Sequence, residues 1–144
     1  MRKTRVLLML GGLAVGLAAA LAFAAISFAG ANTGLAGTHW QLTEINGQPA
    51  VAGDVTPTLQ FLPEDRLSGN GGCNGYGGAY TVNGSALQFS EMMSTLMACA
   101  DDALTTQESA YFQALGSVAS YALSGDTLTL KDASGAPVLV FARL

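Results

Sequence analysis

The sequence contains few of the residues on which most catalytic, metal-binding and phosphate-binding sites depend. Among 144 residues it has one histidine, His39, two cysteines and six basic residues. No lysine lies between Lys3 and Lys131, so the glycine-rich part of the chain has no lysine with which a P-loop would contact a phosphate. The two cysteines are too far apart in the sequence to form the Cys-x-x-Cys pair of thiol oxidoreductases. These scarcities exclude the P-loop and thioredoxin-like motifs.

Half of the basic residues lie at the start of the chain. Three of the first five residues are basic, and an uncharged, apolar run of 24 residues follows at 6–29. Small residues then precede a candidate cleavage site at Gly30, which is the order typical of an export signal. Because about 20 apolar residues also suffice to span a bilayer, an uncleaved anchor in the inner membrane is the alternative. Residues 1–29 are therefore predicted to be a signal peptide or an N-terminal membrane anchor, with the remainder exported to the periplasm or cell envelope.

After this segment, the sequence predicts a short tether, 30–36, and one domain, 37–144. About 115 residues are enough to bury one hydrophobic core. From Gly30 onward, three basic residues stand against ten acidic residues, which gives a formal charge of −7. A domain this acidic is repelled by phosphate backbones and by anionic lipid surfaces. We therefore expect no binding to nucleic acid.

The two cysteines, Cys73 and Cys99, both lie in the part of the chain that is predicted to be exported. An even number of cysteines outside the cytoplasm predicts a disulfide. The loop of about 26 residues that it would close raises the free energy of unfolding by about 3.5 kcal/mol in the chain-entropy account. Free or catalytic thiols are the alternative.

Alternating apolar residues predict several short β-strands. Trp40 and Leu42 alternate with polar residues before an Asn-Gly pair at 46–47. A second Asn-Gly pair, at 83–84, lies between two further alternating runs and predicts a tight hairpin in which both residues take positive φ. The other short strands are predicted at 55–61, 76–82, 87–89, 117–124, 127–131 and 138–144.

One stretch after the predicted signal, 101–118, has the periodicity of a helix. Asp101 or Asp102 can cap its start by accepting backbone N–H groups, and Gly116 is suited to its end. The residues at spacings of three and four are Leu104, Glu108, Tyr111, Phe112, Leu115 and Val118. Strands, then one helix, then strands with hairpin-length connections predict an α+β, mainly β fold. We expect a curled antiparallel sheet or partly open barrel with one helix packed against it.

The stretch GNGGCNGYGGAY, residues 69–80, contains six glycines. It does not match the dinucleotide-binding pattern G-x-G-x-x-G, because the sixth position from Gly69 is Asn74 and no helix follows at once. Glycine permits positive φ and close approach of strands, and asparagine can bond neighbouring backbone groups. We interpret the stretch as a tight structural turn, held by Cys73, that is formed by Gly69, Asn70, Gly71, Gly72, Asn74 and Gly75.

Several segments, taken in order, resemble the META domain family, the family of the heat-shock protein HslJ. They are LAGTHWQLTEINGQP, LQF, DRLSGNGGCNGYGGAYTVNGSALQF, MMSTLMAC, QESAYFQAL and YALSGDTLTLKDASGAPVLVF, which together extend over about residues 35–141. The resemblance implies a compact domain of curled antiparallel strands with a helix, found in envelope or secreted proteins and linked to heat shock and antibiotic tolerance. It implies no catalytic residues. Many exported members carry a lipid-attachment cysteine, and this chain has none near its predicted cleavage site.

Metal binding and catalysis each lack a complete set of residues. A zinc site would need His39, both cysteines and a fourth ligand, and the histidine and cysteine spacings do not supply one. Met92, Met93 and Met97 could bind copper, but such a cluster is more often core filler or an adaptable apolar surface. A hydrolase would have to use His39, without a G-x-S-x-G motif to place a serine. We expect no cofactor, no metal and no enzymatic activity.

Binding to another molecule is the remaining class of function. Five aromatic residues could line a groove between sheet and helix or could fill the core: Trp40, Tyr76, Tyr80, Tyr111 and Phe112. We expect a monomeric, exported domain that serves stress or antibiotic tolerance by binding an envelope protein or an apolar ligand. Two alternatives stay open. One is a small periplasmic inhibitor or ligand-binding protein with a defined pocket, and the other is an envelope hydrolase that uses His39.

Overall fold

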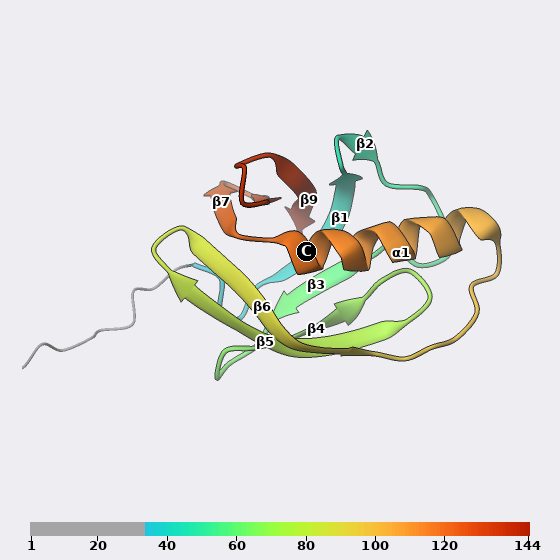
Figure 1. Cartoon of the computed structure of the whole chain (residues 1–144), viewed down its shortest axis with the longest axis horizontal. Helices are drawn as coiled ribbons and strands as arrows, with labels where there is room; N and C mark the ends of the chain where they lie inside the picture. Colours follow the sequence, from blue (N-terminus) through green and yellow to red (C-terminus); the bar gives the residue numbers. More distant parts are fainter. Residues whose placement is uncertain (1–33) are drawn as a thin grey trace, which may run out of the picture.

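The computed structural model describes residues 34–144 (Figure 1). The predicted signal peptide or anchor, 1–29, and the first part of the predicted tether lie outside the described residues. The elements are β1 (His39–Ile45), β2 (Gln48–Pro49), β3 (Thr58–Phe61), β4 (Arg66–Asn70), β5 (Gly75–Asn83), β6 (Ala86–Ser94), α1 (Asp102–Ser117), β7 (Ser120–Ser124), β8 (Thr127–Lys131) and β9 (Pro137–Arg143).

The strands form one antiparallel sheet that curls into a ring. Their order is β2-β1-β3-β4-β5-β6-β7-β8-β9, and β1 also pairs with β9. The β1–β9 pairing extends from Trp40↔Arg143 to Ile45↔Leu139, whereas β6 and β7 pair only at Ala86↔Ser120. The predicted fold class, a curled antiparallel sheet with one helix, is confirmed.

The helix α1 connects the two strands that are paired most weakly. In the chain, α1 lies between the segment that follows β6 and the strand β7. In the view of Figure 1 it runs between β6 and the strands β7 and β9. Asp101 is its N-cap, as predicted, because its Oδ1 accepts a hydrogen bond of 2.8 Å from the backbone N–H of Leu104. The helix ends slightly later than predicted. It continues through Gly116 to Ser117, and Val118 is the C-cap. No described helix is long and apolar enough to span a membrane.

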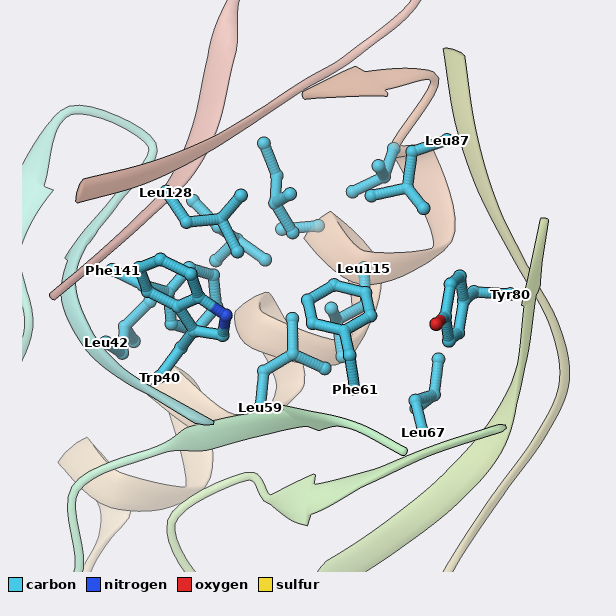
Figure 2. Packing of buried hydrophobic residues seen from close by; sticks show 14 of the residues in the cluster. Trp40, Leu42, Leu59, Phe61, Leu67, Tyr80, Leu87, Leu115, Leu128 and Phe141 are labelled. Atoms are coloured by element: carbon cyan, nitrogen blue, oxygen red, sulfur yellow. The ribbon is translucent and has the colours of Figure 1, made fainter. Parts of the chain in front are cut away.

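The core fills the inside of the ring. Figure 2 shows side chains from β1, β3, β4, β5, β9 and α1 converging there. The strand alternation predicted from the sequence is confirmed, since Trp40, Leu59 and Phe61 are completely buried. Trp40 closes the core at one side, where its Nε1 donates to the hydroxyl of Thr38 at 2.6 Å and Arg143 stacks 4.4 Å from its ring.

The two Asn-Gly turns differ. Asn46 and Gly47 both have positive φ, 50° and 77°, and they join β1 to β2 as a two-residue hairpin loop, as predicted. In the second hairpin Asn83 pairs with Ala86 across the strands, so the loop consists of the next two residues, 84–85. In that loop only Gly84 has positive φ. The turn therefore lies one residue later than the predicted pair, 83–84.

The end of the predicted tether packs into the core. Leu35, which lies in that segment, is completely buried. The backbone N–H of Gly37 donates to the carbonyl of Phe61 at 2.8 Å, and that of Thr38 donates to the carbonyl of Leu35 at 3.0 Å. The end of the predicted tether is thus part of the domain, because burying one leucine removes its apolar side chain from water.

Candidate functional site

The glycine-rich stretch is the turn between β4 and β5, with strand residues at both ends. Gly69 and Asn70 end β4, and Gly75 begins β5. Within the turn, the side-chain oxygen of Asn70 accepts a hydrogen bond of 2.7 Å from the backbone N–H of Gly72, which has a φ of +124°. Asn70 therefore stabilises the turn locally, which is the role that asparagine commonly takes at such positions.

Gly69 is needed because a tyrosine crosses its backbone. The hydroxyl of Tyr76 donates to the carbonyl of Thr58 at 2.7 Å. A Cβ at position 69 would lie 2.6 Å from that hydroxyl oxygen and would also collide with the carbonyl of Thr58. Any side chain at position 69 would therefore displace Tyr76, whose ring is one wall of the site described below.

Tyr76 is joined to the helix through a second buried tyrosine. The hydroxyls of Tyr76 and Tyr111 are 2.7 Å apart, and Tyr111 also approaches the carbonyl of Thr58 at 3.2 Å. Burial raises the pKa of both tyrosines, because removal from water disfavours the phenolate. The pair is therefore neutral near pH 7 and holds α1 against β3 and β5.

Asn74 links the turn to the segment that follows β6. Its side-chain oxygen accepts hydrogen bonds from the backbone N–H of Met97 at 2.6 Å and from the hydroxyl of Thr95 at 2.9 Å. Its side-chain nitrogen donates to the carbonyl of Met97 at 3.0 Å and to Glu108 at 2.7 Å. The sequence predicts that Asn74 bonds nearby backbone groups. Instead its amide pairs with a segment 23 residues away, as a neighbouring strand would.

Glu108 is a buried acid that holds the same turn from the helix. It is 7% exposed. Its carboxylate accepts hydrogen bonds from the backbone N–H groups of Cys73 at 3.1 Å and Asn74 at 2.6 Å, in addition to the side chain of Asn74. These N–H donors stabilise the buried charge. Gly71 makes room for it, because a Cβ there would lie 2.9 Å from Glu108 and 2.8 Å from Phe112.

The two cysteines meet beside Glu108. Cys73 and Cys99 are at disulfide distance, with their Cα atoms 5.4 Å apart, as the sequence analysis predicts. One carboxylate oxygen of Glu108 lies 3.7 Å from the sulfur of Cys99. The three side chains place one ligand atom each within 4.8 Å of one another. Since metal binding needs free thiolates, the crosslinked sulfurs give this cluster a structural role.

His39 stands apart from this cluster. It is exposed on β1, and the potential metal-ligating group contains Glu108 in place of His39. The zinc arrangement considered from the sequence would require His39 beside Cys73 and Cys99, and the hydrolase arrangement would require a serine and a carboxylate beside it. Among residues 34–144 the group of potential metal ligands that contains both cysteines does not include His39.

Next to this rigid turn lies an exposed apolar area, here called the methionine surface. It consists of Met92, Met93, Leu96 and Met97, at the end of β6 and just after it, together with Phe112 of α1. Met93, Leu96 and Met97 are 73%, 95% and 62% exposed. Large apolar side chains that gather on a surface mark sites of contact with other molecules.

A crevice of about 250 Å³ separates the end of β6 from α1. Met92 and Met93 line one side, Phe112 and Leu115 line the other, and Tyr76 contributes to the wall. A more polar hollow continues from it along the segment 94–98, past Asn74 and Glu108. The methionine surface therefore borders a depression that is apolar at one end and has amide and carboxylate groups at the other.

The five aromatic candidates from the sequence separate into two groups. Trp40, Tyr80 and Tyr111 are at most 4% exposed and belong to the core. Tyr76 and Phe112 line the crevice, and their rings meet edge to face with centroids 5.5 Å apart. Leu96 is not among the site residues predicted from the sequence. The run MMSTLM, residues 92–97, could have indicated this exposed apolar surface, because its consecutive apolar residues break the alternation expected of a half-buried strand.

The comparisons with known proteins agree on the fold. The META domain model matches residues 33–143. The chain is similar to a protein from Burkholderia xenovorans studied by NMR, with 25% identity, a TM-score of 0.63, and coverage of 76% of this chain and 83% of that chain. A second NMR structure gives 24% identity, a TM-score of 0.60, and coverage of 73% and 87%.

A crystal structure of a DUF4847 family protein from Bacteroides vulgatus is more distant. It gives 15% identity, a TM-score of 0.56, and coverage of 75% of this chain and 93% of that chain. At that identity the likeness shows the fold alone. A comparison with curated proteins found no match.

Proposed function

This chain belongs to the META domain family, and from that premise we propose that it is an exported, non-enzymatic domain of the cell envelope. In this proposal it contributes to stress or antibiotic tolerance by binding the apolar part of an envelope partner, or an apolar ligand, at the methionine surface. The family assignment predicted from the sequence is confirmed.

The observation that supports binding is the exposure of large apolar side chains on a rigid base. Leu96 and Met97 lie on a segment that Asn74 holds through two hydrogen bonds between its side-chain amide and the backbone of Met97. The adjacent disulfide and Glu108 fix the other side of that base. Because the backbone is already ordered, binding loses little conformational entropy beyond that of the methionine side chains. Methionine side chains adapt to varied apolar partners.

The size of the crevice favours a surface contact over an enclosed small molecule. Pockets that enclose a ligand usually have volumes of about 300–1,000 Å³. The crevice beside Met93 has about 250 Å³, and Leu96, the most exposed side chain of the methionine surface, is not among the residues that line it. This supports binding of part of a larger partner and disfavours the alternative of a ligand-binding protein with a deep pocket.

Two features support export. The apolar run at 6–29 follows basic residues, and Cys73 and Cys99 are at disulfide distance. Disulfides persist in oxidising compartments such as the periplasm. Sequencing the N terminus of the protein purified from the envelope tests this part of the proposal. A start near Gly30 is expected after cleavage, an intact Met1 indicates an anchor, and recovery only from the cytoplasm would contradict export.

The chemistry of the buried polar groups supports a non-enzymatic role. Glu108 accepts hydrogen bonds from three N–H groups, and the hydroxyls of Tyr76 and Tyr111 bond each other and a backbone carbonyl. Each of these groups is already engaged by structural partners. A general acid or base needs a free hydrogen-bonding position toward its substrate.

Crosslinking in the native envelope tests the proposed surface directly. A photoreactive amino acid at position 93 is expected to capture an envelope component, whereas the same group at position 88 is the matched control. Gln88 is exposed on the same strand but lies outside the methionine surface. Equal yields from the two positions, or none from position 93, would contradict binding at this surface.

A solution assay separates apolar binding from partner identity. The fluorescence of Nile red is expected to rise on addition of the wild-type domain and to rise less with Met93→Ser/Leu96→Ser. Complementation of a strain that lacks the chain then tests tolerance. The double variant should fail under heat or antibiotic exposure, while Gln88→Ser should restore growth.

A further inference from the structure

The cluster of Cys73, Cys99 and Glu108 holds the donor atoms of a metal site in a second redox state. Each side chain places one ligand atom within 4.8 Å of the other two. In the crosslinked form the sulfurs are bonded to each other, and the cluster supports the turn. Reduction of that bond leaves two thiols and a carboxylate at the same place. Thiolates and carboxylates are ligands of Zn²⁺ and of related divalent cations.

Glu108 has one acceptor position left, and it faces a cysteine. A carboxylate has about four acceptor positions, two on each oxygen. Its Oε1 accepts from the backbone N–H groups of Cys73 and Asn74, and its Oε2 accepts from the side chain of Asn74. The remaining position of Oε2 faces Cys99, whose sulfur lies 3.7 Å away. A disulfide sulfur carries no hydrogen, so Cys99 gives this oxygen no proton in the crosslinked form.

The spacing of these atoms matches that of a tetrahedral zinc site. With Zn–S bonds of about 2.3 Å and a Zn–O bond of about 2.1 Å, the ligand sulfur and oxygen lie about 3.6 Å apart. The Cys99 sulfur and the Glu108 oxygen are separated by 3.7 Å. Two sulfurs on one zinc ion lie about 3.8 Å apart. Since the cysteine Cα atoms are 5.4 Å apart, rotation of the two side chains is enough to supply that separation.

The fourth position of such a site is open to solvent. Both cysteines are half-buried, and the polar hollow beside them, of about 470 Å³, is lined in part by Asn74 and Glu108. A water molecule from this hollow can complete the tetrahedron, as it does in zinc sites with three protein ligands. The carboxylate is already oriented by its three N–H donors, which is how outer partners prepare a ligand for a metal.

From these observations we propose that the reduced protein binds one Zn²⁺-like cation through the thiolates of Cys73 and Cys99 and Oε2 of Glu108. A dithiol supplies the two electrons: it becomes a disulfide, the Cys73–Cys99 bond breaks, and each sulfur takes one proton. The cation then displaces both protons, which pass to water. A chain whose cysteines have not yet been oxidised is in the same state. The cation thus replaces the disulfide as the link between the turn and the segment that precedes α1, and it adds a bond to the helix.

Electrostatics favours a cation in the reduced site. A thiolate beside the buried carboxylate of Glu108 would place two negative charges close together in a poorly solvated position. A divalent cation removes this repulsion, and the formal charge of −7 from Gly30 onward attracts cations to the domain. The competing arrangement keeps both thiols protonated, with the S–H of Cys99 donating to Glu108, and it binds no metal.

Titration with Co²⁺ tests the proposal, because the absorption spectrum of this ion reports its ligands and geometry. The protein purified from the envelope is divided, and one half is reduced with a phosphine that is then removed under nitrogen. The reduced protein should bind one Co²⁺ per chain, with thiolate-to-cobalt absorption and the intense visible bands of tetrahedral coordination, and Zn²⁺ should displace it. The oxidised protein should show neither band. Absence of both bands from the reduced protein would overturn the proposal.

Variants identify the ligands. Glu108→Gln is expected to weaken Co²⁺ binding by the reduced protein at least about tenfold. Asp102→Asn is the matched control, because it removes the same charge from an exposed position of the same helix and should leave the affinity unchanged. Cys73→Ser keeps the carboxylate and its acceptor role, and it should halve the thiolate absorption. Equal affinity of Glu108→Gln and the wild type would show that the carboxylate is not a ligand and would overturn the three-ligand site.

Thermal unfolding gives a test that needs no variant. Zn²⁺ should raise the melting temperature of the reduced wild type and leave that of the oxidised protein unchanged, because a ligand stabilises the form that binds it. If reduction unfolds the protein, Zn²⁺ should restore the fluorescence of the buried Trp40. Binding with neither effect would show that an unfolded chain holds the cation, which contradicts the proposal.

This inference is independent of the proposed function. None of its measurements involves Met93, so an absent crosslink or an absent Nile red signal at the methionine surface leaves the metal site standing. Conversely, a reduced protein that binds no Co²⁺ leaves the apolar binding surface standing.

Discussion

The ring of strands is closed by different means at its two boundaries. At β1–β9 a ladder of pairs runs from Trp40 to Ile45, and the core residue Phe141 is completely buried beside it. At β6–β7 there is a single pair, at Ala86, and α1 occupies the space between the strands. A strand satisfies the main-chain groups of its neighbour, whereas a helix has already used its own. The β6–β7 boundary therefore keeps main-chain groups and apolar side chains available to a partner. It is called the open boundary below, and the β1–β9 boundary is called the closed boundary.

The closed boundary should be the more sensitive to loss of a core side chain. Phe141→Ala is expected to lower the free energy of unfolding by about 3–5 kcal/mol, because it leaves a cavity in the core. Chemical denaturation of the purified domain measures this loss. Val140, its half-buried neighbour, provides the matched control as Val140→Ala, with a smaller loss. A loss below about 1 kcal/mol for Phe141→Ala would show that this boundary does not limit stability.

The crosslink beside the open boundary should contribute nearly as much. The Cys73→Ser/Cys99→Ser double variant is expected to lose about 3.5 kcal/mol, because the 26-residue separation is no longer constrained in the unfolded chain. The melting temperature reports the effect. Reduction of the wild type should reproduce it, and the double variant should not respond to reductant. An unchanged melting temperature on reduction would remove the disulfide from the account of this region.

The turn that supports the open boundary should tolerate no added side chain. Gly71→Ala is expected to cost about 1–3 kcal/mol, because the new methyl group would press on Glu108 and Phe112. Gly116→Ala is the matched control. That glycine lies in α1 with nothing within 4 Å of an added Cβ, so the change should stabilise the domain by about 0.5–1 kcal/mol. Equal effects at the two glycines, measured by urea denaturation, would contradict the close contact at Gly71.

The exposed side chains of the open boundary should matter least for stability. Met93→Ser is expected to change the free energy of unfolding by no more than about 0.5 kcal/mol, because the side chain is 73% exposed. Leu87→Ala, on the same strand but completely buried, should cost about 2–5 kcal/mol. Thermal unfolding compares the two. A large loss for Met93→Ser would mean that this residue serves the fold and not a partner.

Features with a local cause could be predicted from the sequence. The loop at 46–47 follows from two residues that tolerate positive φ, and the cap at Asp101 follows from a carboxylate placed before a helical pattern. The alternation of Trp40 and Leu42 fixed which side of β1 faces the core. The second Asn-Gly turn shows the limit, because pairing of the flanking strands decided that the loop begins one residue later.

Features of the candidate site had weaker local signals. Glu108 was placed on the inner face of the helix by its spacing, but its hydrogen bonds to Cys73 and Asn74 depend on a turn more than 30 residues away. Asn74 could be read as a turn residue, whereas its amide bonds Met97. An acid at an inward helical position, with no basic residue between Leu67 and Leu130, was the one available sign of a buried acceptor.

The sequence by itself determined the curled antiparallel sheet, the position of its helix and the pairing of the two cysteines, because residue alternation, helical periodicity and cysteine count act without knowledge of distant neighbours. Only the tertiary structure decided that β6 and β7 share a single pair, that Leu96 and Met97 face outward, and that Asn74 and Glu108 hold the segment bearing them. Those features depend on which distant segments meet when the ring closes, and on the space that remains where α1 replaces a strand pairing.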